Sequence, residues 1–317
     1  MRPYIDQTRL SVAPVTPLDL TDFDAGIYAI GYEQRSRHIP EMMKGNTSKL
    51  VGIDLGGGAT SLRVSRQRAV DRGDTVILSR QIGFSEASVH VSELNIPDRG
   101  RMFVDISSMD RRTMSLVIYH VLRTVQKRAM EICFLYAPAK YNDPPEDMLP
   151  IQSSEPVNAL LSGAPRDPRL PTILFLGLGY EVGLALGVVE FFEPARVLAF
   201  TPRGTDPRYD TMVDQVNETL FSDQDYIKRI DYSVLSPANT LIALKEQVLA
   251  LREIAKIVFV PLGPKIFSSM AILLGYLYAP DITVWRVSTQ LDPNQADRIA
   301  DGSIIGYKLQ VRSPNGA

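Results

Sequence analysis

The chain has 317 residues, 45% of them hydrophobic, and a formal net charge of −2. That length and composition suffice for two domains with their own cores. The near-zero charge excludes a basic coat along the chain, so we expect no broad nucleic-acid-binding surface.

The first part of the chain alternates between apolar runs of strand length and segments of helical period. The strands are predicted at residues 27–30, 49–54, 75–78, 101–106 and 131–136, and the helices at 35–43, 62–72 and 109–128. The last helix has the strongest signal, because Met114, Val117, Ile118 and Val121 recur at i, i+3, i+4 and i+7 spacing. These elements predict a first Rossmann-like half over residues 1–141.

Residues 142–171 differ in composition, since they hold seven of the 22 prolines in the chain. Proline interrupts both helices and strands, so this segment is interpreted as a linker or a long crossover.

The alternation then restarts and predicts a second half over residues 172–317. Strands are predicted at 172–178, 196–200, 229–234, 256–260 and 282–287, and helices at 182–192, 208–220, 239–254 and 266–278. Residues 303–311 could add one more strand at an edge.

Short sequence matches relate the two halves. Ile30-Gly31-Tyr32-Glu33 pairs with Leu178-Gly179-Tyr180-Glu181, and the run 103–108 pairs with 259–264 at a nearly equal offset. Each match alone is weak, and two generic α/β halves could look alike by chance. Together they predict an internally duplicated α/β protein with mainly parallel sheets, in which ligands bind beyond the carboxyl ends of the strands.

Glu33 and Glu181 occupy equivalent places after apolar strands. Each could accept hydrogen bonds from a ribose hydroxyl or a base edge, or act as a general base. Each could equally cap the helix that follows. Asp105, at the end of another strand, is the best further carboxylate in the first half. If the chain is an enzyme, these three carboxylates are the catalytic candidates.

Two further strand-to-helix turns are candidate binding sites for an anion. Ser107, Ser108, Arg111 and Arg112 lie at the start of a long helix, where backbone N–H groups and guanidinium groups suit a phosphate. Ser107 or Ser108 could instead be the N-cap. In the second half, Gly263 permits close backbone approach and Lys265 adds a charge, although a solvated lysine at a helix start fits equally well.

Other features carry weaker signals. Arg203 lies in a loop cluster that could be site or surface. The single Cys133 sits in an apolar run, which fits a buried side chain and a cytoplasmic, reducing environment. No run reaches the roughly 18 apolar residues of a membrane span, and no residue spacing indicates a metal site, so neither a membrane, a metal nor a cofactor is expected. Residues 51–58 resemble the first phosphate loop of sugar kinases and actin-like ATPases. In those families a β-hairpin follows the loop, whereas here a strand and a helix precede it and a helix is predicted at residues 62–72.

The turns at Asp105-Ile106-Ser107-Ser108 and Leu262-Gly263-Pro264-Lys265 resemble those of the CRISPR-associated Rossmann fold (CARF) sensors and of the SAVED domains of prokaryotic antiviral systems. These families bind cyclic oligonucleotides between two Rossmann halves. The resemblance implies that Ser107, Ser108, Gly263 and Lys265 line a nucleotide pocket. The Gly-Tyr-Glu pair is no signature of these families, and the absence of an effector domain implies a separate protein partner or a homo-oligomer.

Three hypotheses follow. The first is a nucleotide-binding sensor or regulatory subunit that takes a phosphate-containing ligand at the strand ends. The second is an enzyme that acts on a nucleotide or nucleic acid, as a nuclease or glycosidase does, with Glu33, Asp105 and Glu181 as acid and base and with Arg111 and Lys265 stabilising negative charge. The third is a structural subunit of a larger complex.

Overall fold

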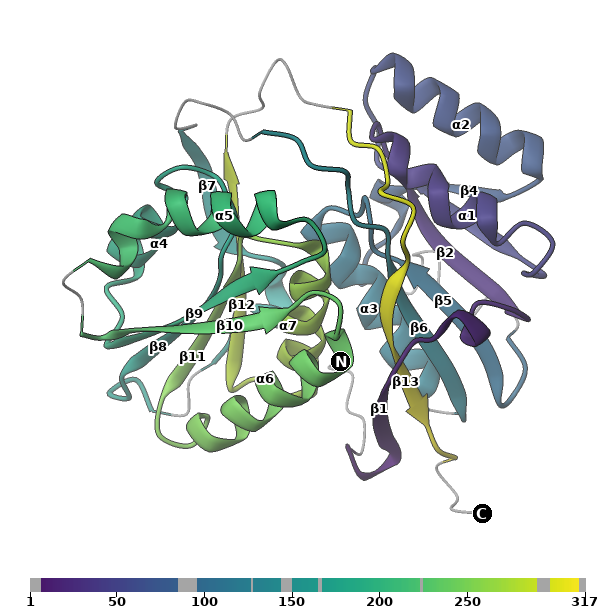
Figure 1. The fold of residues 1–317 in the computed structure, drawn as a ribbon. Helices are drawn as coiled ribbons and strands as arrows, with labels where there is room; N and C mark the ends of the chain where they lie inside the picture. Colours follow the sequence, from purple (N-terminus) through teal and green to yellow (C-terminus); the bar gives the residue numbers. More distant parts are fainter. Residues whose placement is uncertain are drawn as a thin grey trace. The chain divides into compact units, whose positions relative to one another are not determined.

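The computed structural model describes residues 7–84, 96–126, 128–143, 150–164, 167–222, 225–289 and 297–313. Figure 1 shows the order of the elements along the chain. They form two compact units, one from residues 3–140 with 296–317 and the other from residues 141–295. Each unit is a mostly parallel sheet flanked by helices, so the α/β class and the two Rossmann-like halves are confirmed.

The first unit is built on a seven-stranded sheet with strand order β1-β13-β6-β5-β2-β3-β4. Its elements are β1 (Leu10–Pro14), β2 (Ala25–Ile30), the 3-10 helix η3 (Gln34–Arg37), α1 (His38–Met42), β3 (Leu50–Asp54), α2 (Thr60–Arg72), β4 (Thr75–Leu78), β5 (Gly100–Asp105), α3 (Arg111–Val125), β6 (Met130–Tyr136) and β13 (Ile305–Val311). β2 to β6 are parallel, and β13 and β1 are antiparallel additions to that core.

The second unit is built on a six-stranded sheet with strand order β10-β9-β8-β11-β12-β7. Its elements are β7 (Ile151–Pro156), β8 (Thr172–Gly177), α4 (Leu184–Phe192), β9 (Arg196–Arg203), α5 (Pro207–Val216), β10 (Ile227–Ser233), α6 (Pro237–Leu251), β11 (Lys256–Pro261), α7 (Lys265–Leu277) and β12 (Ile282–Thr289). All strands are parallel except β7, which pairs antiparallel with β12.

The two sheets share one topology. The order β4-β3-β2-β5-β6-β13 of the first matches β10-β9-β8-β11-β12-β7 of the second, and the sixth strand is antiparallel in both. This is the Rossmann strand order, with the direction of winding reversing between β2 and β5 and between β8 and β11. Ligands of such sheets bind outside the carboxyl ends of the strands on either side of that reversal.

The unit boundaries differ from the ranges predicted from sequence. β13 belongs to the first sheet although it follows the second half in sequence, and its register with β6 runs from Ile305–Tyr136 to Val311–Met130. Tyr307 is fully buried and stacks on Phe134, with ring centroids 5.0 Å apart. The proline-rich segment 142–171 in turn contains β7, which completes the second sheet. The choice between two equivalent sheet edges depends on long-range packing, which local sequence does not encode.

Helices cover both faces of the second sheet. Alternate residues of β8, β9 and β11 pack against α4 and against Val213 of α5. The opposite face carries Phe175 and Phe200, and Phe267 of α7 packs on Phe200 at a centroid distance of 5.4 Å. Sheet layers with helices on both sides bury continuous apolar strands, as the fully buried Leu174 and Leu176 illustrate.

Candidate functional site

The carboxyl ends of β2 and β5 meet at the first reversal point, and two predicted residues come into contact there. Glu33 follows β2 and Ser108 follows β5, and the Ser108 hydroxyl lies 3.2 Å from Oε2 of Glu33. Gly31 permits this approach, because a β carbon on it would lie 3.3 Å from Cβ of Ser108. Glu33 and Ser108, which follow two adjacent strands, are therefore in contact at the reversal point.

Glu33 is held by guanidinium groups. Nε of Arg35 donates to Oε2 of Glu33 at 2.7 Å, and Nε of Arg298 lies 3.8 Å from Oε1. Arg35 is 4% exposed and also donates to the hydroxyl of Tyr136 at 3.4 Å. Although Glu33 precedes η3, its side chain makes no capping hydrogen bond. The glutamate is therefore the anionic member of a buried polar cluster, and the capping alternative does not hold for it.

Asp105 lies beside this cluster and is 2% exposed. It accepts hydrogen bonds from the backbone N–H of Ser107 at 2.9 Å and from the Ser107 hydroxyl at 2.5 Å. Burial raises the pKa of Asp105 to about 7, against the opposing effect of the Ser107 hydrogen bonds and the Arg35 charge. The Ser107 hydroxyl also accepts from the N–H of Ala137 at 2.8 Å. Asp105 and Ser107 thus tie the end of β5 to the residue that follows β6.

The N-cap of α3 is Asp110, and neither Ser107 nor Ser108 takes that position. The Asp110 carboxylate accepts from the N–H of Thr113 at 2.9 Å and from its hydroxyl at 2.7 Å. The expectation that Ser107 or Ser108 could be the cap is wrong. The Asp110 carboxylate occupies the N–H of Thr113 at this helix end, and its negative charge would repel a phosphate.

The two arginines of this turn both lie on the first turn of α3. Arg111 is partly buried and Arg112 is exposed. Both residues directly follow Asp110, the N-cap of this helix. A ligand role for Arg111 and Arg112 gains no support from the geometry of the turn.

The second reversal point, between β8 and β11, is a close approach of two backbone turns. A β carbon on Gly263 would lie 2.0 Å from the carbonyl oxygen of Leu178, and one on Gly179 would lie 2.3 Å from Oε2 of Glu181. The N–H of Gly263 donates to the carbonyl of Gly177 at 3.1 Å. Gly263 therefore allows two backbone turns of the protein to pack closely. The sequence analysis instead proposed that this residue contacts a ligand. Glu181 lies over the turn, with its carboxylate next to Gly179.

The helix that starts at this turn, α7, differs from α3. Its N-cap is Pro264, which supplies no side-chain hydrogen bond, and its first turn contains no acidic residue. It begins with Lys265, which is half-buried. Ser268 is fully buried, and its hydroxyl has no hydrogen-bond partner within the described parts of the chain. A helix start of this kind favours an anion, because its N–H groups and dipole present positive charge.

Arg203 is engaged elsewhere. Its guanidinium donates to Asp214 at 3.0 Å and to Asp231 at 3.1 Å, and Arg229 pairs with the same two carboxylates. A cation that already binds two carboxylates has little charge left for a ligand, so the predicted ligand role of Arg203 is unsupported.

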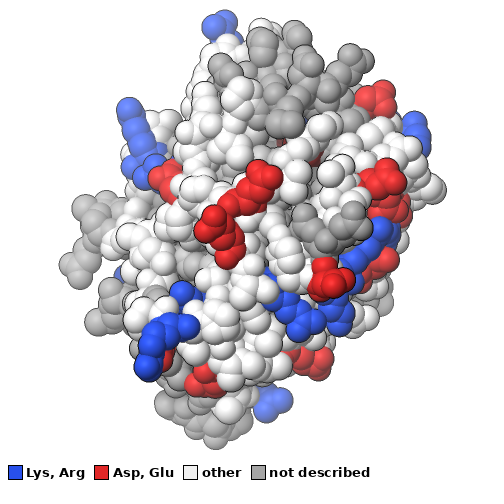
Figure 2. All heavy atoms as spheres, turned by 90° about the vertical axis from the view of Figure 1, so that its left-hand side faces the viewer, with Lys and Arg blue, Asp and Glu red and all other residues white. Residues whose placement is uncertain are grey.

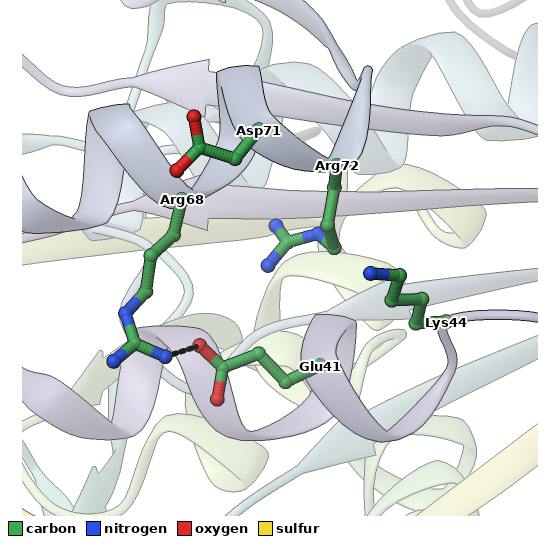
Figure 3. A pocket seen from close by; sticks show the side chains of 5 residues that line it. All are labelled: Glu41, Lys44, Arg68, Asp71 and Arg72. Atoms are coloured by element: carbon green, nitrogen blue, oxygen red, sulfur yellow. Dashed lines mark hydrogen bonds and ion pairs between the residues drawn. The ribbon is translucent and has the colours of Figure 1, made fainter.

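A hollow of about 210 Å³ lies between α1 and α2 (Figure 3). It is lined by Glu41, Lys44, Arg68, Asp71 and Arg72. Nη1 of Arg68 donates to Glu41 at 2.8 Å, as Figure 3 shows, and Arg72 pairs with Asp74 at 2.6 Å. These charges largely compensate one another, so the hollow is not assigned a ligand.

Sequence reasoning missed several residues of both sites. Arg35 stands two positions from Glu33, and that spacing in a turn is a usable signal. Arg298 lies near the other end of the sequence, and no local signal relates it to Glu33. In the second unit, Tyr180 lies within the Gly-Tyr-Glu motif, but its aromatic neighbours Tyr141 and Tyr209 are distant in sequence.

The wider surface and the remaining side chains add further observations. On the face in Figure 2, Lys and Arg stand in small groups interspersed with Asp and Glu.

Among the described residues, no three His, Cys, Asp or Glu side chains are placed to hold a metal ion. Within the same residues, no helix combines the length and apolarity needed to cross a membrane. The loop at residues 51–58 is followed by α2, as the sequence predicts, and not by the β-hairpin that follows the corresponding loop of sugar kinases and actin-like ATPases.

Comparisons with known proteins show no family. No family model matches the chain, and no curated protein matches it. One solved structure, leucoanthocyanidin reductase from Vitis vinifera in complex with NADPH, is 11% identical, with 86% of this chain and 95% of that chain covered. Its TM-score is 0.24, which is too low to carry a conclusion about this chain.

Proposed function

We propose that this chain is a nucleotide-binding sensor or regulatory subunit that binds a phosphate-containing ligand in its second unit, at the reversal point between β8 and β11. The observation that carries the proposal is the difference between two equivalent helix starts. α3 is capped by the Asp110 carboxylate, whereas α7 has no side-chain cap and begins with Lys265. Of the two predicted anion sites, the geometry therefore favours the second.

The groups at this turn suit different parts of a nucleotide. The ammonium group of Lys265 and the N-terminal N–H groups of α7 would bind a phosphate. The Ser268 hydroxyl, buried and without a partner in the described chain, could add a hydrogen bond if the turn shifts on binding. Glu181 repels phosphate but accepts hydrogen bonds from ribose hydroxyls, as carboxylates at strand ends do in Rossmann folds.

The first unit would then have a supporting role. Glu33, Arg35 and Ser108 already satisfy one another, and Asp105 is bound to Ser107. A polar cluster that is internally satisfied rigidifies the strand ends around it. The resemblance to CARF and SAVED domains stays a prediction, and with it the cyclic oligonucleotide ligand, the antiviral role and the separate partner.

The test is a thermal-shift and calorimetric screen of the full chain against nucleoside mono- and diphosphates, dinucleotides and cyclic oligonucleotides. A ligand at 100 times its Kd stabilises the native state by about 2.7 kcal/mol. The variant Lys265→Ala should weaken binding roughly tenfold or more, which is the loss expected for a hydrogen bond to a charged group.

Lys256→Ala is the matched control, because Lys256 lies at the amino end of β11, opposite the proposed site, and its substitution removes the same charge. Equal affinity in Lys265→Ala and wild type would place the ligand elsewhere. A screen with no shift from any nucleotide would contradict the proposal and favour the structural subunit.

One observation favours a second candidate, an enzyme acting on nucleotides or nucleic acids. A carboxyl with a pKa of about 7, such as Asp105, is suited to exchange protons at neutral pH. Incubation with labelled nucleotides and single-stranded DNA or RNA, followed by chromatography, would reveal products. Asp105→Asn should abolish any turnover. Product formation that survives Asp105→Asn, Glu33→Gln and Glu181→Gln alike would exclude these carboxylates.

A further inference from the structure

Three tyrosines of the second unit form a continuous aromatic row. The ring centroids of Tyr180 and Tyr209 are 5.6 Å apart, and those of Tyr209 and Tyr141 are 4.9 Å apart. Tyr180 directly follows Gly179, the glycine whose β carbon would lie 3.2 Å from the carbonyl of Leu262. One end of the row therefore stands at the turn where the proposed ligand site lies.

Arg208 extends the row at its other end. Its guanidinium carbon lies 4.6 Å from the ring centroid of Tyr141. Nε and Nη2 of Arg208 donate to the Asp206 carboxylate, which also accepts from the backbone N–H of Arg208 as the N-cap of α5. The guanidinium plane is thus held in position, while the side chain stays 66% exposed.

The row differs from the aromatic core of the same unit. Phe175, Phe200 and Phe267 are 0%, 4% and 0% exposed, whereas all three tyrosines are only half-buried. Phenylalanine is often fully buried and tyrosine is intermediate, so the observation that counts is that part of each tyrosine ring stays open to solvent. Partly exposed rings and a planar cation at the carboxyl edge of a Rossmann sheet are the groups on which nucleobases stack.

The duplication shows that the row is particular to the second unit. Arg208 and Tyr209 are the second and third residues of α5, and the same positions of α2, which is the equivalent helix in the first unit, hold Ser61 and Leu62. The aromatic row therefore occurs in the unit whose α7 lacks a carboxylate cap. Two independent differences between the halves converge on one site.

We propose that Tyr141, Tyr209, Tyr180 and Arg208 form a base-stacking subsite, so that the ligand is a nucleoside phosphate whose base stacks on this row. The inference rests on the proposed function and narrows its ligand from any phosphate ester to one that carries a nucleobase. Stacking accepts every base, because each has a π face. The subsite therefore supplies affinity, while discrimination between bases needs other contacts.

The test compares calorimetric affinities of the full chain for the four ribonucleoside 5′-monophosphates and for ribose 5-phosphate. Both kinds of probe carry the same phosphate and sugar, and only the first carries a base. Wild type should bind at least one monophosphate about tenfold or more tighter than ribose 5-phosphate. Tyr209→Leu should remove most of that difference, and Tyr209→Phe should keep it.

Phe191→Leu is the matched control, since Phe191 is an aromatic residue of the same unit that is 59% exposed on α4. A melting temperature of Tyr209→Leu equal to that of wild type would show that its loss of affinity comes from the missing ring and not from misfolding.

The outcomes separate this inference from the proposed function. If ribose 5-phosphate binds as tightly as every monophosphate, or if Tyr209→Leu leaves the ratio unchanged, the stacking subsite is refuted while the phosphate site stands. If the base preference depends on Tyr209 but no affinity depends on Lys265, the stacking subsite stands and the phosphate assignment fails. If none of the five probes binds, the stacking subsite is refuted, and the phosphate site is overturned as well if the wider nucleotide screen also shows no shift.

Discussion

Arg35 and Glu33 form an ion pair at the carboxyl end of β2, with 2.7 Å between Nε and Oε2, although the guanidinium is only 4% exposed. The pair is two residues apart in sequence, so it forms within a single turn. Ser108 and Tyr136 add hydrogen bonds from the ends of β5 and β6. A buried charge pair is stable only when its remaining donors and acceptors are satisfied in this way.

Glu33→Gln should destabilise the protein strongly, because it leaves the Arg35 charge buried without its counterion. Removing one partner of a buried pair costs about 3–5 kcal/mol. Glu41→Gln is the control, since it breaks an ion pair with Arg68 whose side chains are 55% and 40% exposed. That change should cost less than about 1 kcal/mol. Urea unfolding measures both, and similar losses for the two variants would contradict the buried character of the first pair.

Asp105 should make the stability of the protein depend on pH between about 4 and 7. Its pKa is about 7 in the folded chain and 3.8 ordinarily, so the native state holds a proton that the unfolded state has released. The contribution of this group is therefore fully present below pH 4 and is lost as pH rises toward 7, with a slope of up to about 1.4 kcal/mol per pH unit.

Asp105→Asn keeps the acceptor for Ser107 and removes the titration. The free energy of unfolding of wild type minus that of the variant should fall as pH rises from 4 to 7 and level off above 7. A difference that does not vary with pH would show that Asp105 ionises at its ordinary pKa.

Gly263→Ala should disturb the turn between β8 and β11, because the added β carbon would lie 2.0 Å from the carbonyl oxygen of Leu178. Backbone atoms cannot move aside as a flexible side chain does, and overpacking of this kind costs about 1–3 kcal/mol. Gly204→Ala is the control in the same unit, since nothing lies within 4 Å of its β carbon position. Thermal melting should show a lower midpoint for the first variant only. Equal midpoints would mean that the two turns pack less closely.

Asp110→Ala should destabilise α3 by about 1 kcal/mol, the usual cost of losing an N-cap. Ser108→Ala should cost less, because Ser108 makes one hydrogen bond of 3.2 Å to Glu33 and does not cap the helix. Chemical denaturation followed by circular dichroism compares the two. A larger loss for Ser108→Ala than for Asp110→Ala would reverse the assignment of the cap.

Local elements were predictable because their signals are local. The spacing of Met114, Val117, Ile118 and Val121 identifies α3, although the helix is buried on nearly all sides and spans Arg111–Val125 rather than residues 109–128. The strand 75–78 is found where it was predicted, as β4. The repeated Gly-Tyr-Glu motif correctly indicated a duplication, since the two sheets share their strand order.

The candidate site was predictable only in part. Glu33, Asp105, Ser107 and Ser108 lie at the strand ends, as the general rule for parallel sheets requires. The contacts among these residues depend on side-chain geometry, which the sequence does not give. The same holds for the cap of α3 and for the binding of Arg203 to Asp214 and Asp231. The alternative that Ser107 or Ser108 caps α3 was wrong, because Asp110 and Ser108 are both good cap residues and only the position of the helix start separates them.

By itself, the sequence determined the order of the strands and helices and placed polar groups at the strand ends, because periodicity and turn residues act over a few positions. Only the tertiary structure decided that β13 returns to the first sheet, that Arg298 reaches Glu33, and that Tyr141, Tyr209 and Tyr180 form one row. Such contacts join residues far apart in the chain. They are selected by the summed packing and hydrogen bonding of a whole unit, which no short stretch of sequence contains.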